Sequence, residues 1–394
     1  MPMNGLLVTL PITDNMKDGI NVKSIAIVVL FMNEFGKKGF YQSQEIGLAN
    51  AFYEAGWDVE IFRCIPGESY EEGDRYPIHY RKVIKFGSHA LFNPKKFFHR
   101  KFDFMAAFCD TELIVPKLSK YCHKNGITFI PYVGATESVS FSQKFKKTIM
   151  DFIYKHNTLK TYINDSQYIF CKNHDTMKRL VEKGVPEDKL IFSPVGMNVS
   201  MLHQNYSFDD VKKLRKNNGY DPDDKVILFV GRLNNEKRPL DTFKILDLLN
   251  DSNYKLIIIG DGFLKEDVQK KTAEYGSRVQ YYDKVPYDQM WKYYVMADYF
   301  INLWNEEVFG MAILEAIFYL TPAFLISAPG PRVIAKDLSN SYICENIEEI
   351  VKKIKGYQYN AQSLEKDKLL LISQFSWDSF VGNVERVFGT EKEA

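Results

Sequence analysis

The chain has 394 residues, 45% of them hydrophobic, and a formal net charge of +1 at pH 7. This length exceeds one ordinary hydrophobic core and favours two α/β domains of about 150 to 200 residues each. Basic residues outnumber acidic ones by 26 to 21 in residues 1–200, whereas acidic ones lead by 29 to 25 in residues 201–394. Since no recognisable nucleic-acid motif accompanies the charge, we do not expect a nucleic-acid partner.

Two further features of the sequence indicate the cellular compartment of the protein. The five cysteines form no C-x-x-C pair and have no histidine at zinc-finger spacing, which favours buried thiols in a reducing compartment. The sequence starts without a basic and apolar leader, and it contains no run of about 18 apolar residues. We therefore expect a cytoplasmic protein that does not span a membrane. The cysteines are Cys64, Cys109, Cys122, Cys171 and Cys344.

In the first half of the chain, short apolar runs alternate with segments of helical period, which is typical of βαβ units and a parallel sheet. The polar segment Met197–Asp224 then interrupts this pattern with asparagine, glycine and proline, and it places a linker around residues 198–210. The strands predicted before it are Ser24–Leu30, Asp58–Phe62, Ile127–Tyr132, Gln167–Cys171 and Leu190–Ser193.

The second half restarts the same pattern. We therefore predict an α/β protein of two Rossmann-like domains that face each other across a cleft. Ligands of such sheets bind outside the carboxyl ends of the strands, so the cleft is the expected site. The strands predicted in this half are Lys225–Val230, Lys255–Ile259, Arg278–Tyr281, Tyr299–Leu303 and Pro322–Ile326.

The first candidate segment, Lys225–Pro239, reads KVILFVGRLNNEKRP. Arg232 and Lys237 follow a strand and the glycine turn at Gly231, just before a helix that starts near Leu240. Such a place suits a diphosphate, because Arg offers a bidentate fork, Lys a point charge and the helix its free N–H groups. From spacing alone, a solvated loop with ordinary charges is an equal alternative.

The second segment, Leu256–Gly262, reads LIIIGDG and again ends a strand in a glycine turn. Asp261 is a possible metal ligand, but a single carboxylate between two glycines is more often a turn residue. We therefore favour the turn.

The third segment, Asn305–Ile317, reads NEEVFGMAILEAI. Gly310 is predicted to open a helix, so Glu307 lies in the loop before it and Glu315 lies about one and a half turns inside. Two carboxylates that face one cleft can accept hydrogen bonds from vicinal hydroxyls of a sugar or ribose. The alternative for Glu315 is an ordinary exposed helix position, which its apolar neighbours disfavour.

Together these segments resemble the large retaining glycosyltransferase family with the GT-B fold, often called family 4. The order and spacing of the motifs over most of the chain make this likeness specific. It extends to the first βα unit around Gly39, to Cys171–Val195 and to Phe375–Phe388. The motifs are G-R-L-x-x-E-K at Gly231–Lys237, G-D-G at Gly260–Gly262, A-D at Ala297–Asp298 and E-x-F-G-x-x-x-L-E-A at Glu307–Ala316.

The resemblance implies a GT-B fold in three parts. Residues 1–200 form an acceptor-binding Rossmann-like domain, and residues 201–375 form a second one that binds a nucleotide sugar. Residues 376–394 form a helix that crosses back to the first domain. The implied reaction is a retaining, metal-independent hexosyl transfer to a glycan, lipid-linked or other glycoconjugate acceptor, with no cofactor.

Matching positions imply roles for individual residues. Arg232 and Lys237 would hold the donor diphosphate, and Glu307 would contact hydroxyls of the transferred sugar; these three are the expected catalytic residues. Glu315 would bind the ribose. The donor-side glycines implied by the family pattern are Gly39, Gly231 and Gly310, and Asp298 is expected to support the fold.

Three departures from the family pattern leave the acceptor side open. Phe40 follows Gly39 where a glycine pair is usual, and Pro329–Gly330–Pro331 replaces another pair. Pro131–Glu137 reads PYVGATE and lacks the histidine that many members carry there. The altered acceptor strand leaves one alternative, a protein that binds the donor without catalysis. A second alternative is a nucleotide-sugar epimerase of the same fold, since that chemistry also occurs on paired Rossmann domains with similar donor contacts.

Arg75–Phe102 holds eight Lys and Arg, seven aromatic residues and no Asp or Glu. Nearby, Phe145, Ile149, Phe152 and Ile153 fall on one predicted helical face. Basic charge with interleaved aromatics fits a surface that rests on anionic lipid, so we expect peripheral binding to the inner face of a membrane. A solvated basic face over a normal core helix is an equal alternative.

Overall fold

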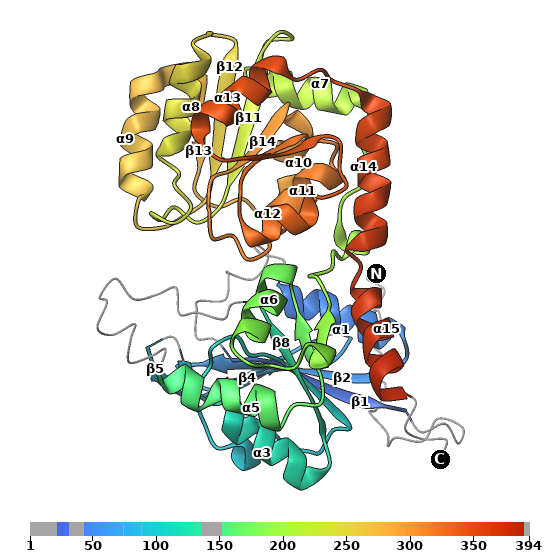
Figure 1. Ribbon diagram of the computed structural model, residues 1–394. Coiled ribbons are helices and arrows are strands. Elements are labelled where there is room, and N and C mark those ends of the chain that lie inside the picture. Colours follow the sequence, from blue (N-terminus) through green and yellow to red (C-terminus); the bar gives the residue numbers. More distant parts are fainter. Residues whose placement is uncertain (1–21, 31–42, 74, 88, 135–151, 390–394) are drawn as a thin grey trace, which may run out of the picture.

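The computed structural model describes residues 22–30, 43–73, 75–87, 89–134 and 152–389. Figure 1 shows two α/β halves, one above the other, each built around its own sheet. The first sheet is formed by residues up to Phe192, and the second begins at Lys225. This arrangement confirms the predicted α/β class with two Rossmann-like domains.

The first sheet has eight strands in the order β10-β9-β8-β7-β1-β2-β4-β3, all parallel except the edge strand β3. Its central strand is buried along its whole length, as expected where helices cover both faces of a parallel sheet. The strands are β1 (Ser24–Val29), β2 (Asp58–Ile65), β3 (Tyr70–Glu72), β4 (Ile78–Lys82), β7 (Phe104–Phe108), β8 (Thr128–Val133), β9 (Ile169–Cys171) and β10 (Leu190–Phe192).

Helices pack on both faces of this sheet, and a small hairpin lies beside it. The hairpin pairs β5 (Ile84–Phe86) with β6 (His89–Leu91) in antiparallel register. The helices are α1 (Gln44–Glu54), α2 (Pro94–Phe97), α3 (Val115–Asn125), α5 (Thr158–Asn164) and α6 (His174–Glu182).

The second sheet has six parallel strands in the order β13-β12-β11-β14-β15-β16. Its strands are β11 (Lys225–Val230), β12 (Tyr254–Ile259), β13 (Val279–Tyr282), β14 (Tyr299–Asn302), β15 (Ala323–Ile326) and β16 (Ser341–Cys344). Its helices are α7 (Phe208–Asn217), α8 (Asp241–Leu249), α9 (Lys265–Tyr275), α10 (Tyr287–Met296), α11 (Met311–Phe318), α12 (Pro329–Ile334), α13 (Ile347–Gly356) and α14 (Ala361–Gln374).

The predicted strands all occur, with ends that differ by at most three residues. The prediction missed six strands, β3 to β7 and β16. Strand β7 reads FMAAF, whose two alanines have little strand preference, and β4 reads IHYRK, whose polar residues hide its apolar side. Both strands are stabilised by pairing with their neighbours and by burial, and their local composition contributes little.

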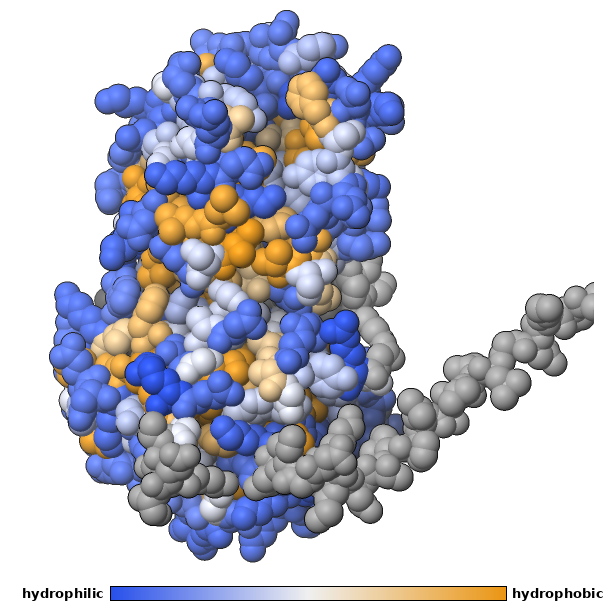
Figure 2. All heavy atoms as spheres, turned by 90° about the vertical axis from the view of Figure 1, so that its right-hand side faces the viewer, coloured by the Kyte–Doolittle hydropathy of each residue, from blue (hydrophilic) through white to orange (hydrophobic). Residues whose placement is uncertain are grey.

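The carboxyl-terminal segment crosses back to the first domain. Helix α14 packs on α11 of the second domain, whereas α15 (Trp377–Phe388) packs on α1 of the first. Gly47 and Gly196 leave room for the Trp377 ring and backbone, because a Cβ atom at either glycine would overlap them. Figure 2 shows the face that carries α14 and α15, with apolar side chains gathered near the junction of the two halves. The predicted crossing helix is therefore confirmed.

All five cysteines are buried and free, as expected from their spacing. Among the described residues, no helix is long and apolar enough to cross a membrane.

Candidate functional site

Two turns at the carboxyl edge of the second sheet pack against each other. The loop after β11 starts at Gly231, and the turn after β12 contains Gly260 and Gly262. Gly260 has φ of 156°, and a Cβ atom there would overlap the carbonyl oxygen of Gly231. Glycine is therefore needed at position 260 for the two strand ends to approach this closely.

Lys237 and Glu307 meet at this edge although 70 positions separate them in the chain. The Lys237 ammonium forms an ion pair with Oε2 of Glu307, which also accepts a hydrogen bond of 3.2 Å from the Asn302 amide. Lys237 Nζ lies 4.2 Å from the centre of the Trp304 ring, a cation–π contact. The structure thus brings together two of the three predicted catalytic residues.

Arg232, the third, is exposed, and no ion pair or hydrogen bond of its side chain is recorded within the described part of the chain. It lies in the same loop as Lys237, whose backbone N–H donates to Asn234 Oδ1 over 3.0 Å. The loop therefore presents one paired and one exposed cation at the end of β11. This is more than the solvated loop of ordinary charges, because one cation is fixed by a buried carboxylate.

The backbone around Glu307 is fixed by glycines. Gly310 has φ of 105°, in the left-handed region, and it is the residue that precedes helix α11, as predicted. The Gly330 N–H donates to the Glu307 carbonyl oxygen over 2.8 Å, and a Cβ atom on Gly330 would overlap the backbone of Phe309. The Pro329–Gly330–Pro331 sequence therefore supports the loop that carries Glu307.

Glu315 lies inside helix α11 and is 7% exposed, so the alternative of an ordinary exposed position is wrong. Its carboxylate accepts hydrogen bonds from Tyr287 Oη at 3.2 Å and from Tyr294 Oη at 2.7 Å. Burial raises the pKa of Glu315 to about 7, although both tyrosine hydrogen bonds oppose that shift. This carboxyl group therefore changes charge near neutral pH.

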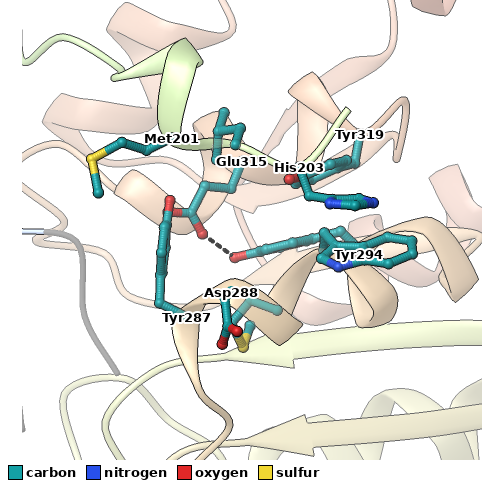
Figure 3. Close-up of a pocket in the computed structure, with 10 residues that line it drawn as sticks. Met201, His203, Tyr287, Asp288, Tyr294, Glu315 and Tyr319 are labelled. Carbon is teal, nitrogen blue, oxygen red and sulfur yellow. Dashed lines mark hydrogen bonds between the residues drawn. The ribbon is translucent and has the colours of Figure 1, made fainter. Parts of the chain in front are cut away.

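Glu315 lines a cavity of about 170 Å³ between helices α10 and α11 (Figure 3). In Figure 3, its carboxylate lies between the Tyr287 and Tyr294 side chains. Residues 201–203, in the segment that joins the two domains, cover one side of this cavity. There the ring of His203 stacks on that of Trp291, with 4.2 Å between the ring centres. The lining combines aromatic and aliphatic side chains with the polar groups of His203, Asp288 and Glu315, and convergent polar groups are typical of small-molecule sites.

Sequence reasoning missed the aromatic residues around both carboxylates. Tyr287, Trp291 and Tyr294 follow one another at helical spacing on α10, a signal that indicates one aromatic face. Trp304 gave no signal, since its role depends on the loop that brings it over Lys237.

Asp298 and Asp261, which the sequence analysis also singled out, stabilise local structure. Asp298 Oδ2 accepts hydrogen bonds from Arg215 Nη1 at 3.0 Å and from the Val226 N–H at 2.7 Å, so it supports the fold as expected. Asp261 accepts from the Gly262 N–H over 2.9 Å and pairs with Lys284 at 2.8 Å, as a turn residue does. Gly39 lies outside the described residues.

The two sheets face each other with their carboxyl edges. Asn173, which follows β9, donates a hydrogen bond of 2.9 Å from Nδ2 to the Val308 carbonyl oxygen in the loop beside Glu307. Arg332 of the second domain pairs with Asp175 of the first at 3.0 Å. The candidate donor residues therefore lie at the interface between the domains.

Comparison with known families and proteins places this site in context. Residues 210–366 match the family described as Glycosyl transferases group 1. The chain is 26% identical over 240 residues to an uncharacterized glycosyltransferase of Methanocaldococcus jannaschii, an alignment that covers 57% of this chain and 61% of that protein. It is also 26% identical over 201 residues to the alpha-monoglucosyldiacylglycerol synthase of Acholeplasma laidlawii, covering 49% of each.

Solved structures are similar over almost the whole chain. Anabaena HepE, solved in complex with UDP and glucose, superposes with a TM-score of 0.68 at 14% identity, covering 93% of this chain and 99% of that one. This likeness shows that the chain has the GT-B fold. The curated relatives are matched over about half to three fifths of their length.

Proposed function

We propose that this protein is a retaining, metal-independent glycosyltransferase that moves a hexosyl group from a nucleotide sugar to a hydroxyl-bearing acceptor. The observation that carries the proposal is the meeting of Lys237 and Glu307 at the carboxyl edge of the second sheet, inside the segment that matches the glycosyltransferase family. Open α/β sheets bind their ligands at that edge.

The donor diphosphate is assigned to Lys237 and Arg232. The ion pair with Glu307 fixes the position of the Lys237 ammonium. The exposed Arg232 guanidinium can add a bidentate contact to a phosphate. As the anomeric C–O bond breaks, negative charge grows on the departing diphosphate, and these fixed cations stabilise it.

The sugar and the ribose are assigned to the two carboxylates. Glu307 is 7% exposed and anchored by Asn302, which suits it to accept hydrogen bonds from sugar hydroxyls. Glu315 would accept from the ribose hydroxyls in exchange for part of its tyrosine contacts. HepE, which has the same fold, was solved in complex with UDP and glucose. This supports a uridine nucleotide as the first donor to test.

The retaining reaction needs no side-chain nucleophile in this proposal. The acceptor oxygen bonds to the anomeric carbon on the face from which the diphosphate leaves, and the acceptor proton passes to a phosphate oxygen. Atoms and charge balance without a metal, because Lys237 and Arg232 neutralise the leaving group. The domains supply the remaining contribution by holding both substrates close together.

The first domain is proposed to rest on anionic membranes through Arg75–Phe102. In this segment Tyr76, Tyr80, Phe97, Phe98 and Phe102 are buried, so most of its aromatic residues belong to the core and not to a lipid surface. What remains exposed is the β5–β6 hairpin, where Ile84 is 72% and Phe86 56% exposed beside exposed lysines. In the predicted helical face of Phe145, Ile149, Phe152 and Ile153, the first two residues lie outside the described part of the chain.

The test of the proposed function begins with a thermal screen of sugar nucleotides, starting with UDP-glucose. A ligand at 100 times its dissociation constant adds about 2.7 kcal/mol to stability, which shifts the unfolding temperature measurably. The stabilising donor is then incubated with neutral sugars and diacylglycerol, and the products are analysed for a new glycosidic bond and its anomeric form.

Each outcome separates the candidates. An α-linked product from an α-linked donor supports a retaining transferase. A donor epimer without a new glycosidic bond indicates an epimerase. Nucleotide binding without hydrolysis or transfer indicates a protein that only binds the donor, and no stabilisation by any nucleotide refutes the proposal.

A further inference from the structure

Three neighbouring strands of the first sheet end in residues that no motif identifies. Strands β7, β8 and β9 lie side by side, and they are followed by Asp110, Gly134 and Lys172. Because the strands are parallel, these residues reach the same edge of the sheet. That edge faces the loop of Glu307, since the next residue, Asn173, donates its hydrogen bond to Val308.

Lys172 is an unusual residue for its position. It is 6% exposed, and its ammonium lies 5.1 Å from the centre of the Phe108 ring and 4.9 Å from that of Tyr132. Within the described part of the chain, no hydrogen bond or ion pair of this ammonium is recorded. Burial lowers the pKa of Lys172, and the nearby Asp110 carboxylate offsets the shift only in part. A buried cation held mainly by ring contacts costs stability, which is typical of binding sites.

Asp110 is fixed beside it in a costly backbone conformation. Its φ of 36° falls in the left-handed region, where aspartate is tolerated better than most residues. Oδ1 accepts a hydrogen bond of 2.6 Å from the Gly134 N–H, and the Asp110 carbonyl oxygen accepts one of 2.8 Å from Tyr162. Strain of this kind persists where surrounding bonds such as these hold the residue in place, and it is frequent at functional sites.

Gly134 lets these groups approach the second domain. A Cβ atom at Gly134 would lie 2.7 Å from Lys172 Cδ and 2.8 Å from Val308 Cγ1, distances that real Cβ atoms do not adopt. The side chains of Lys172 and Val308 therefore both pack against position 134, and a larger residue there would force them to shift. This brings the Lys172–Asp110 pair next to the residue that follows Glu307.

We propose that Lys172 and Asp110 form an acceptor site for a neutral, hydroxyl-rich molecule such as a sugar or polyol, held against the sugar that Glu307 binds. The ammonium donates to one hydroxyl and the carboxylate accepts from another. A cation and an anion together suit a neutral ligand, because Asp110 repels an anionic acceptor and Lys172 repels a cationic one. The inference rests on the proposed glycosyl transfer.

The experiment compares Lys172→Met and Asp110→Asn with wild type. The donor is the sugar nucleotide chosen by the thermal screen, and the acceptor probes are octyl β-glucoside, maltose and glycerol, with glucose 6-phosphate as the anionic comparison. Transfer rates give kcat/KM for each acceptor, calorimetry gives the affinity for the nucleoside diphosphate, and thermal unfolding gives stability. Lys178→Met, an exposed lysine on α6, is the matched control.

We expect kcat/KM for the neutral acceptor to fall about 10- to 100-fold in both variants, because each loses a hydrogen bond made by a charged group. Nucleotide affinity should stay at the wild-type value. The unfolding temperature of Lys172→Met should equal or exceed that of wild type, since a buried cation is removed, whereas a purely structural lysine would lower it. Lys178→Met should leave all three quantities unchanged.

Three results would overturn the inference. The first is unchanged kcat/KM in Lys172→Met or Asp110→Asn, and the second is a parallel loss of nucleotide affinity, which would place Lys172 on the donor side. The third is wild-type transfer to glucose 6-phosphate but to none of the neutral probes. If Lys172→Met does not fold, Lys172→Arg decides the matter, because it keeps the charge and must lower kcat/KM without lowering nucleotide affinity. A wild type that binds no sugar nucleotide refutes the proposed function itself.

Discussion

The two sheet edges that face each other differ in how their charges are satisfied. At the edge of the second sheet, Glu307 is paired with Lys237, and Glu315 is held by two tyrosines. At the edge of the first sheet, Lys172 is buried against rings, and no ion pair of its ammonium is recorded among the described residues. The charges of the proposed donor edge are thus satisfied by protein groups, whereas the proposed acceptor edge contains a cation held by aromatic rings.

The largest expected effect concerns the proposed donor edge. Changing Lys237 or Arg232 to Ala should lower turnover at saturating donor by about 10² to 10³, because each removes a fixed positive group from a developing anion. Arg232→Lys should also be impaired, since a point charge does not reproduce the bidentate fork. Lys244→Ala, an exposed lysine on α8, is the control. Near-normal turnover in both Ala variants would contradict the diphosphate assignment.

Excess chelator should leave wild-type turnover unchanged, because these cations replace a metal. If turnover falls instead, the same assay with His99→Ala shows where the metal binds. Glu60, His79 and His99 are the group among the described residues whose potential ligand atoms lie within 4.8 Å of one another, and they lie in the first domain. If excess chelator also lowers the turnover of His99→Ala, the metal would lie at the proposed donor edge, and metal independence would be refuted.

Substitutions of the two carboxylates at the proposed donor edge should affect nucleotide binding and sugar transfer separately. Glu315→Ala should weaken binding of the free nucleoside diphosphate by about 1.5 to 3 kcal/mol, the usual cost of a lost hydrogen bond to a charged group. Glu307→Ala should lower transfer while nucleotide affinity holds or improves, because Lys237 is released for the phosphate. Calorimetry measures the first quantity and product formation the second. Equal losses of nucleotide affinity would remove the distinction.

A smaller effect follows from the pKa of Glu315, about 7 in the folded protein. An ordinary glutamate titrates near 4.3, so between these values the folded state binds the proton more tightly and stability falls as pH rises. Ribose hydroxyls donate to the ionised form, so nucleotide affinity should increase from pH 6 to pH 8. Calorimetry of wild type and Glu315→Gln isolates this change, because the nucleotide's own titration is common to both. The same pH profile in the two proteins would speak against the ribose assignment.

The smallest expected effect concerns the surface of the first domain. Binding to liposomes with anionic lipid should exceed binding to neutral ones and should weaken with added salt, since charges are screened over about 8 Å at physiological ionic strength. Replacing Ile84 and Phe86 together by Ser should reduce it further, whereas Phe208→Ser in the second domain should not. Phe208 is 73% exposed and serves as the matched control. Equal sedimentation with both kinds of liposome would end the membrane proposal.

The residues of the proposed donor edge could be singled out from the sequence because they lie close together in it. Arg232 and Lys237 share one loop, and Glu307 and Glu315 share another, so their spacing carried the signal. The fold could be predicted because most of its strands are unbroken apolar runs. What spacing did not reveal was the contact between these two loops, which depends on the pairing of β11 with β14 in the sheet.

The facing edge was not predictable for a physical reason. Asp110, Gly134 and Lys172 come from three separate strands and meet only because β7, β8 and β9 are neighbours in the sheet. Strand β7 itself was missed, so Asp110 had no predicted position. Likewise, Lys172 looks like any surface lysine until its burial against Phe108 and Tyr132 is known.

The chain passes between the domains twice, and the two crossings touch. The Met197 N–H donates to the Phe375 carbonyl oxygen over 2.7 Å, which joins the outgoing segment to the returning one before α15. We infer that these two paired backbone segments form a hinge line about which one domain rotates against the other. Opening about that line would break the Asn173–Val308 hydrogen bond and the Arg332–Asp175 ion pair, both on the cleft. Among the described residues, substrate entry would therefore cost these two polar contacts across the cleft.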